Sequence, residues 1–204
     1  SDHATKSDTK DDENIDSKDH QDNDDKDKNS NLNKNQNSDQ DSDSADSEET
    51  DKQSSEEGIH TYEVITADMT WDEAYNDCIK RGGYLARINS REEWNAIIAQ
   101  IQASNTEACY FYVSGTRNDG GSSYYWKNEN GELYGEPLNS SAFWGNDLWL
   151  ENEPSFQDGD VTEDAMAILY MKSANRWVLN DVANNPLETE SYLSGKIAYI
   201  CEYE

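Results

Sequence analysis

Six carboxylate side chains, and no Lys or Arg, fall within one short segment, LENEPSFQDGDVTED at residues 150–164. They are Glu151, Glu153, Asp158, Asp160, Glu163 and Asp164. Two unit charges about 4 Å apart repel each other by about 4 kcal/mol at an effective dielectric constant near 20. The segment therefore either holds these groups apart in water or gathers them around a bound cation.

Catalytic chemistry has few candidates in this chain. Its three histidines are His3, His20 and His60. This placement excludes Ser-His-acid and Cys-His catalysis and a His-rich zinc site in the rest of the chain. A pair such as Glu153 and Glu163 could serve glycoside hydrolysis, but acidic pairs are common in a chain this acidic. We therefore expect a binding protein and not an enzyme.

Composition divides the chain into two parts at residue 58. Residues 1–58 contain no Phe, Trp or Tyr and carry 20 acidic against 7 basic residues. Such a segment cannot bury enough apolar surface to offset the entropy lost on ordering. We expect it to be a disordered acidic tether with a random-coil span of roughly 40 Å. Residues 59–204 hold every aromatic side chain and are expected to form one domain.

The charge of the chain restricts its partners. The net charge is -28, and residues 59–204 alone hold 24 acidic and 9 basic residues. Nucleic acid is excluded, because its phosphates must be neutralised by Lys and Arg. The same charge argues against an anionic membrane surface, and no apolar run approaches the length of a spanning helix.

Two helices are expected near the start of the domain, after a strand at residues 59–66. Thr70 and Glu73 form a capping box, and the following helix ends at Gly82. Its buried face carries Trp71, Ala74, Tyr75, Cys78 and Ile79. A second capping box, Ser90 to Glu93, begins a helix that buries Trp94, Ile97, Ile98 and Ile101.

Strands are expected at residues 84–88, 109–116, 124–127, 165–171, 177–180 and 196–203. Residues 131–164, the long loop, lack periodicity but contain Trp144, Trp149 and Phe156, which favours an ordered loop with its own small core. The fold class is therefore α+β, with two helices against mostly antiparallel strands.

Two of the three cysteines, Cys78 and Cys201, could form a disulfide, and Cys109 has no obvious partner. A bridge between Cys78 and Cys201 would close a loop of about 120 residues, worth about 4–5 kcal/mol, and would imply an oxidising compartment. Two unrelated buried thiols are the alternative. Cys109 alternates with Phe111 and Val113, so we expect a buried free thiol there.

The ordered set of motifs resembles the C-type lectin-like domain family across residues 59–204. WDEAYNDC, GGYLARINS and EEWNAI resemble its two-helix start, and YVSG stands at the position of its Trp-Ile-Gly motif. Trp149 with Glu-Pro-Ser, Trp177 with Asn-Asp, and the closing ICEY resemble its later motifs. The resemblance implies the Cys78–Cys201 disulfide and a fold with a long loop region.

The resemblance also implies a calcium site that answers the question of the acidic segment. Glu153 and Glu163 supply carboxylates, Asn180 a side-chain carbonyl, and Asp181 a carboxylate and its own backbone carbonyl. Ser155 stands in place of an asparagine ligand. Glu153, Ser155, Glu163 and Asn180 are the implied ligand-binding residues. Calcium takes 6–8 oxygen ligands, and open coordination positions can accept sugar hydroxyls.

Three further features follow from the family pattern. The Glu153–Pro154 bond is expected to be cis. The hydroxyl of Ser155 replaces an amide and weakens metal and sugar contacts. Ala165 and Asn184 stand where the family has its second disulfide, which this chain lacks.

The predicted function is calcium-dependent carbohydrate recognition by a monomer at the cell surface. The alternative is a calcium-independent protein-binding or adhesion module of the same fold. In that case Tyr134, Phe143 and Trp144 would supply contacts, although packing of the long loop is the favoured role for them. The acidic tether resembles that of bacterial surface lipoproteins, which indicates an extracellular location.

Overall fold

The computed structural model of the protein describes residues 58–204. The predicted tether, residues 1–58, lies outside the described residues apart from Gly58. Helices α1 and α2 span Trp71–Lys80 and Arg91–Ala103, and 3-10 helices η1, η2 and η3 span Asn146–Leu148, Pro186–Glu188 and Ser191–Leu193. The strands are β1 (Thr61–Thr66), β2 (Tyr84–Leu85), β3 (Tyr110–Arg117), β4 (Tyr124–Lys127), β5 (Leu133–Tyr134), β6 (Gln157–Asp158), β7 (Val161–Thr162), β8 (Ala165–Met171), β9 (Arg176–Val182) and β10 (Ile197–Tyr203).

Helices α1 and α2 begin at their predicted caps. The Thr70 hydroxyl accepts from the Glu73 backbone N–H at 3.1 Å, and the Glu73 carboxylate accepts from the Thr70 backbone N–H at 2.9 Å. The Ser90 hydroxyl likewise accepts from the Glu93 backbone N–H at 3.2 Å. The Glu93 carboxylate, however, accepts from the Asn89 backbone N–H at 2.6 Å, so the second capping box is only half formed.

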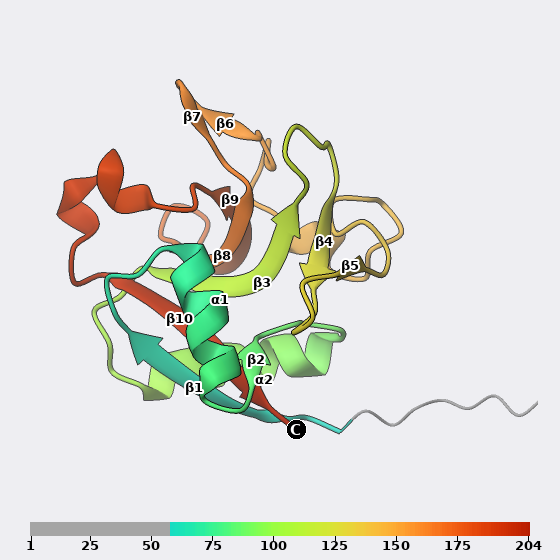
Figure 1. Cartoon of the computed structure of the whole chain (residues 1–204), viewed down its shortest axis with the longest axis vertical. Helices are drawn as coiled ribbons and strands as arrows, with labels where there is room; N and C mark the ends of the chain where they lie inside the picture. The colour runs from blue at the N-terminus through green and yellow to red at the C-terminus, as the bar shows by residue number, and fades with distance from the viewer. Residues whose placement is uncertain (1–57) are drawn as a thin grey trace, which may run out of the picture. The chain divides into compact units, whose positions relative to one another are not determined.

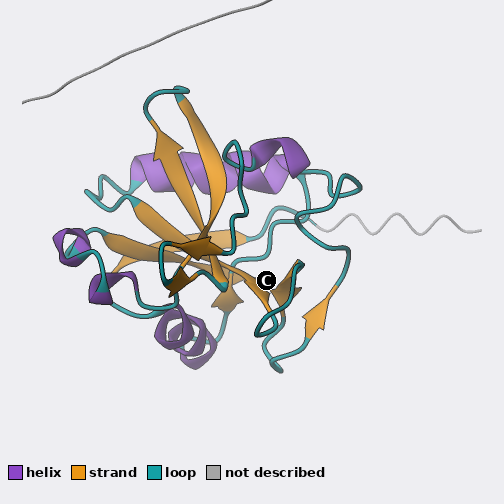
Figure 2. Ribbon diagram, turned by 90° about the horizontal axis from the view of Figure 1, so that it is seen from above, coloured by secondary structure: helices purple, strands orange, loops and turns teal. Residues whose placement is uncertain are grey.

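One eight-stranded sheet links most of the described strands. Its main path runs β1-β10-β3-β4-β5, while β2 pairs with β10 and β8 joins β3 to β9. Among these strand pairs β10–β3 is parallel and the others are antiparallel, which confirms the α+β class. The two α-helices flank the central strands on opposite sides (Figure 2), and each contributes to its own hydrophobic cluster.

A disulfide joins helix α1 to the last strand. Cys78 and Cys201 are bonded, with 5.4 Å between their Cα atoms, and both side chains are fully buried. Trp71, Ala74 and Tyr75 are buried on the same helix face as Cys78. The pairing and the buried helix stripe are therefore confirmed.

The predicted burial of Cys109 is wrong. Cys109 lies one residue before β3 and is exposed, and its backbone N–H donates to Lys196 O at 2.8 Å. Phe111, Tyr112 and Val113 are all buried, because the two faces of β3 pack against different hydrophobic clusters. An alternating pattern therefore does not describe this strand, and the thiol gains no burial from it.

The long loop is ordered around its aromatic side chains. Phe143, Leu148 and Trp149 are buried, and the Trp149 indole N–H donates to Leu138 O at 2.8 Å. The loop ends in the small β6–β7 hairpin, which projects from the opposite end of the domain to the C-terminus (Figure 1). The loop is ordered as predicted, but its aromatic side chains pack into the larger hydrophobic cluster of the domain and not into a small core of their own.

Candidate functional site

Three carboxylates from two distant segments meet beside the long loop. Glu153 and Glu163 come from the loop and Asp181 from β9, and one oxygen of each lies within 4.8 Å of the others. The loop is tied to β9 by the Leu150 N–H, which donates to Leu179 O at 2.9 Å. The structure therefore brings together the two segments that the family resemblance combines.

Two oxygens of this cluster are buried and have no hydrogen-bond partner among the described residues. They are Glu153 Oε2 and Asn180 Oδ1. The other end of the Asn180 amide is engaged, because Nδ2 donates to Asp181 O at 2.7 Å. A buried acceptor without a partner is rare and costs free energy, so each of these oxygens calls for a donor or a cation.

Asp181 is held by the protein itself. Its side chain is fully buried, and Oδ2 accepts from the Phe156 backbone N–H at 2.7 Å and from the Tyr124 hydroxyl at 3.0 Å. The Ser155 backbone N–H lies at 3.4 Å from Oδ1. These donors fix the carboxylate at the inner edge of the cluster.

Arg117 connects the loop to the sheet below the cluster. Its side chain is only 7% exposed, and its guanidinium donates to Phe156 O at 2.9 Å, Glu163 O at 3.1 Å and Gly121 O at 2.6 Å. It also pairs with the Asp164 carboxylate at 2.9 Å. Glu163 is thus positioned through its backbone, which leaves its carboxylate free to face the cluster.

Like charge and burial raise the proton affinity of the loop carboxylates. The pKa of Glu163 rises from 4.5 to about 7, first because burial removes water and then because Asp181 and Glu153 lie nearby. Burial also raises the pKa of Glu153, with the neighbouring Asp181 adding to the shift. At an effective dielectric constant near 20, charges 4.8 Å apart repel by about 3 kcal/mol per pair. A divalent cation would remove this repulsion.

The donor set fits calcium. Three carboxylates and one amide carbonyl supply oxygen ligands only, and calcium prefers oxygen in flexible arrangements. The two unpartnered oxygens, Glu153 Oε2 and Asn180 Oδ1, are acceptors and belong to this set. The residues that would hold the ion are Glu153, Glu163, Asn180 and Asp181.

The remaining predicted residues take different positions. Ser155 is exposed, and its hydroxyl lies 3.3 Å from Glu163 Oε2, where it can donate to that carboxylate. Asp158 and Asp160 are exposed in the β6–β7 hairpin, as expected of a solvated rim. The Glu153–Pro154 bond is cis, as predicted.

Sequence reasoning missed Arg117 and Tyr124, which hold the site from below. Tyr124 bonds both Asp181 Oδ2 and Glu163 O, the latter at 2.5 Å. A signal for Arg117 was present, because basic residues are rare in this domain and one at the end of a central strand is expected to meet an acidic partner. No sequence signal separates Tyr124 from the other tyrosines.

The two flanking helices, the central sheet and the ordered long loop together define a lectin-like domain. The model of the Lectin C-type domain family matches residues 67–183, more than half of the chain. The chain therefore belongs to the C-type lectin domain family, whose members are generally non-catalytic binding modules. None of the described helices is long and apolar enough to cross a membrane.

Individual relatives agree with this assignment. Human C-type lectin domain family 4 member A is 28% identical over 121 residues, which cover 59% of this chain and 44% of that protein. The chain thus spans less than half the length of this curated relative. The comparisons give no support to the resemblance to bacterial surface lipoproteins.

Solved structures show the same fold. The C-type lectin CEL-I from Cucumaria echinata has a TM-score of 0.51 and 15% identity, over 72% of this chain and 91% of that chain. Human lithostathine has a TM-score of 0.50 and 15% identity, over 72% of this chain and 93% of its own. At such identities the likeness establishes the fold alone.

Proposed function

We propose that the domain is a calcium-dependent glycan-binding module whose site is the acidic cluster of the long loop. The observation that carries this proposal is the pair of buried, unpartnered oxygens, Glu153 Oε2 and Asn180 Oδ1, beside three converging carboxylates. A purely structural cluster would satisfy these oxygens with protein donors. Their free lone pairs support a cation between the loop and β9.

The residues of the site would have different roles in binding. Asp181 is fixed by Tyr124 and the Phe156 backbone, so it provides a preformed anchor for the ion. When bound, calcium offers coordination positions to adjacent hydroxyls of a sugar. The carboxylate of Glu153 can accept from those hydroxyls, and the Asn180 amide can donate to them. The hydroxyl of Ser155, exposed at the rim, adds a donor or an acceptor.

Isothermal titration with CaCl2 tests the metal. The intact chain is expected to bind calcium, whereas Glu153→Gln and Asn180→Ala are expected to weaken binding at least about tenfold. Glu151→Gln is the matched control, because Glu151 is an exposed loop carboxylate outside the cluster. Equal calcium affinity in Glu153→Gln, Asn180→Ala and the control would mean that the ion, if bound, lies elsewhere.

A glycan array in CaCl2 and in EDTA tests the ligand. Binding that is present with calcium and lost with EDTA supports the proposal. The alternative, recognition of a protein by the same fold, is favoured by the exposed aromatic rings of Tyr170 and Tyr192, which are 42% and 65% exposed. An array without signal in either buffer would favour this alternative.

The Cys78–Cys201 disulfide supports an extracellular location for the module. Such bonds form and persist in oxidising compartments and are rare in the cytosol. We infer a surface-tethered arrangement in which residues 1–58 act as the spacer.

A further inference from the structure

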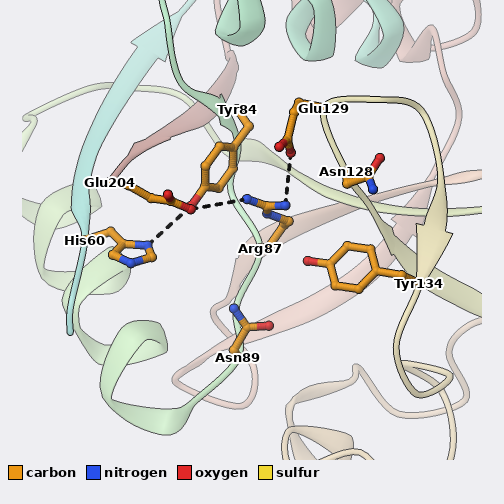
Figure 3. A pocket seen from close by; sticks show the side chains of 8 residues that line it. All are labelled: His60, Tyr84, Arg87, Asn89, Asn128, Glu129, Tyr134 and Glu204. Carbon is orange, nitrogen blue, oxygen red and sulfur yellow. Dashed lines mark hydrogen bonds and ion pairs between the residues drawn. The ribbon is translucent and has the colours of Figure 1, made fainter. Parts of the chain in front are cut away.

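A second cavity lies at the end of the domain that carries the C-terminus, away from the acidic cluster. We call it the terminus pocket. It is formed by the start of β1, the segment after β2, the β4–β5 hairpin and the last residue of the chain, and its volume is about 330 Å³ (Figure 3). Its walls are polar, and no residue of the proposed calcium site lines it.

Arg87 lies at the centre of the terminus pocket and is held rigidly. Its side chain is 13% exposed, and its guanidinium stacks 3.6 Å from the centre of the Tyr84 ring. One Nη donates to Glu129 at 3.2 Å, and the other lies 3.9 Å from Glu204. A guanidinium carries more N–H donors than these contacts use. The remaining donors are available to a ligand in the cavity.

His60 adds a second donor to the wall. Its Nδ1 lies 2.5 Å from the carboxylate of Glu202, which is 1% exposed. This hydrogen bond raises the pKa of His60, since the buried carboxylate stabilises the imidazolium. With Nδ1 engaged, Nε2 is the ring nitrogen that remains to donate. Donors from Arg87 and His60 thus stand beside acceptors from Glu129 and Glu204 (Figure 3).

Charge selects a neutral ligand for the terminus pocket. Glu129 and Glu204 are 50% and 71% exposed at its rim, and the domain as a whole is strongly acidic, so an anion is repelled. Arg87 is paired with both of these carboxylates, so neither sign of charge is left unpaired in the lining to attract a cation or an anion. A neutral molecule that offers hydroxyl groups can accept from Arg87 and donate to the rim carboxylates at the same time. Tyr134, 38% exposed, adds an apolar ring face.

We propose that the terminus pocket binds one ring of a neutral saccharide without calcium. The volume of the terminus pocket is near the lower end of the range for small-molecule sites. It therefore admits a single sugar ring and not an extended oligosaccharide. Alternating donors and acceptors match the hydroxyls, and the Tyr134 ring offers a stacking surface for the C–H face of the sugar. This site goes beyond the proposed function, because it needs neither the long loop nor a metal ion.

Two-dimensional NMR of the intact chain in excess EDTA tests the proposal. Titration with methyl glycosides of mannose, galactose and N-acetylglucosamine is expected to shift the resonances of Arg87 and Tyr134, with at least one glycoside binding in the millimolar range. Tyr134→Ala is expected to weaken that binding about tenfold, while Tyr134→Phe retains it because the ring remains. Tyr192→Ala, which removes an exposed tyrosine elsewhere, is the matched control.

Three outcomes would overturn the proposal: no glycoside binding in EDTA, unchanged binding in Tyr134→Ala, or tighter binding of sialic acid than of every neutral glycoside. The variant Glu163→Gln separates this site from the calcium site. It is expected to leave glycoside binding in EDTA intact even where calcium uptake is lost. Failure of one site therefore leaves the other testable.

Discussion

Replacing Glu163 with Gln is expected to stabilise the calcium-free domain at about pH 8, although the change removes a candidate metal ligand. In the folded chain the pKa of Glu163 is raised from 4.5 to about 7, so the folded state binds this proton more tightly than the unfolded state. Stability is then lost as the pH rises between these two values, because the folded chain must give up the proton or carry a crowded charge. The neutral Gln side chain carries no such penalty.

The magnitude follows from the two pKa values. Their separation corresponds to at most about 3 kcal/mol of unfolding free energy above pH 7. Water reaches this half-buried carboxylate and screens the interaction, which reduces the expected gain of Glu163→Gln to about 1–2 kcal/mol. Near pH 4.5 the original side chain is largely protonated in the folded state, and the difference between the two proteins should be small.

Urea denaturation of both proteins in EDTA, from about pH 5 to pH 8, measures this difference directly. Comparing the two proteins at each pH cancels the titration of the carboxylates that do not interact with Glu163. In saturating CaCl2 the order is expected to reverse at pH 8, since the ion stabilises the original protein and not the variant. If Glu163→Gln is equally stable or less stable than the original in EDTA at pH 8, the carboxylates are not crowded and the electrostatic reasoning is wrong.

Three further predictions test the parts that support the site. Replacing Cys78 and Cys201 together with Ala is expected to lower the unfolding free energy by about 4–5 kcal/mol, measured by urea denaturation, because the disulfide spans a sequence separation of 123 residues. Arg117→Ala is expected to cost about 2–4 kcal/mol and to weaken calcium binding, whereas an unchanged melting temperature would contradict its role. Cys109 is exposed and should react with iodoacetamide in the native protein, faster as the pH rises because the thiolate is the reactive form; labelling only after denaturation would disprove its exposure.

Local sequence rules predicted the helices of this fold well, because helix caps and buried stripes depend on neighbouring residues. The Thr70 cap and the buried face of α1 are in place. The cap of α2 departs from prediction where tertiary structure intervenes. Glu93 is 3% exposed, and its carboxylate bonds to the Asn89 backbone and not to that of Ser90.

The positions of the longer strands were predicted closely, and 124–127 and 165–171 match β4 and β8 residue for residue, but burial along a central strand depends on what covers each face of the sheet. The predicted burial of Cys109 is wrong for this reason. The pattern around it indicated one buried face, whereas β3 is covered on both sides and begins one residue later. Predicting which residues of β3 are buried would have required the strand order β10-β3-β8. That order includes a parallel pair between segments more than 80 residues apart in the sequence.

The candidate site also has a part that the sequence predicted and a part that depends on tertiary structure. Its outer half, Glu153, Glu163 and Asn180, was predicted because family motifs name these residues. Its inner half consists of Asp181, which the family motifs also name, and of Tyr124 and Arg117, which were missed because each contacts backbone groups far away in the sequence.

These two halves differ physically as well as in how they were found. The inner half is satisfied by protein hydrogen bonds: Asp181 by Tyr124 and the Phe156 N–H, and the loop carbonyls by Arg117. The outer half combines like charges with oxygens that have no partner among the described residues, a combination that an added cation would satisfy. Loss of the ion should therefore loosen the loop around Glu153 while leaving Asp181 and β9 in place. Because the strand keeps half of the site formed, binding of the proposed ion would need to order only one short segment.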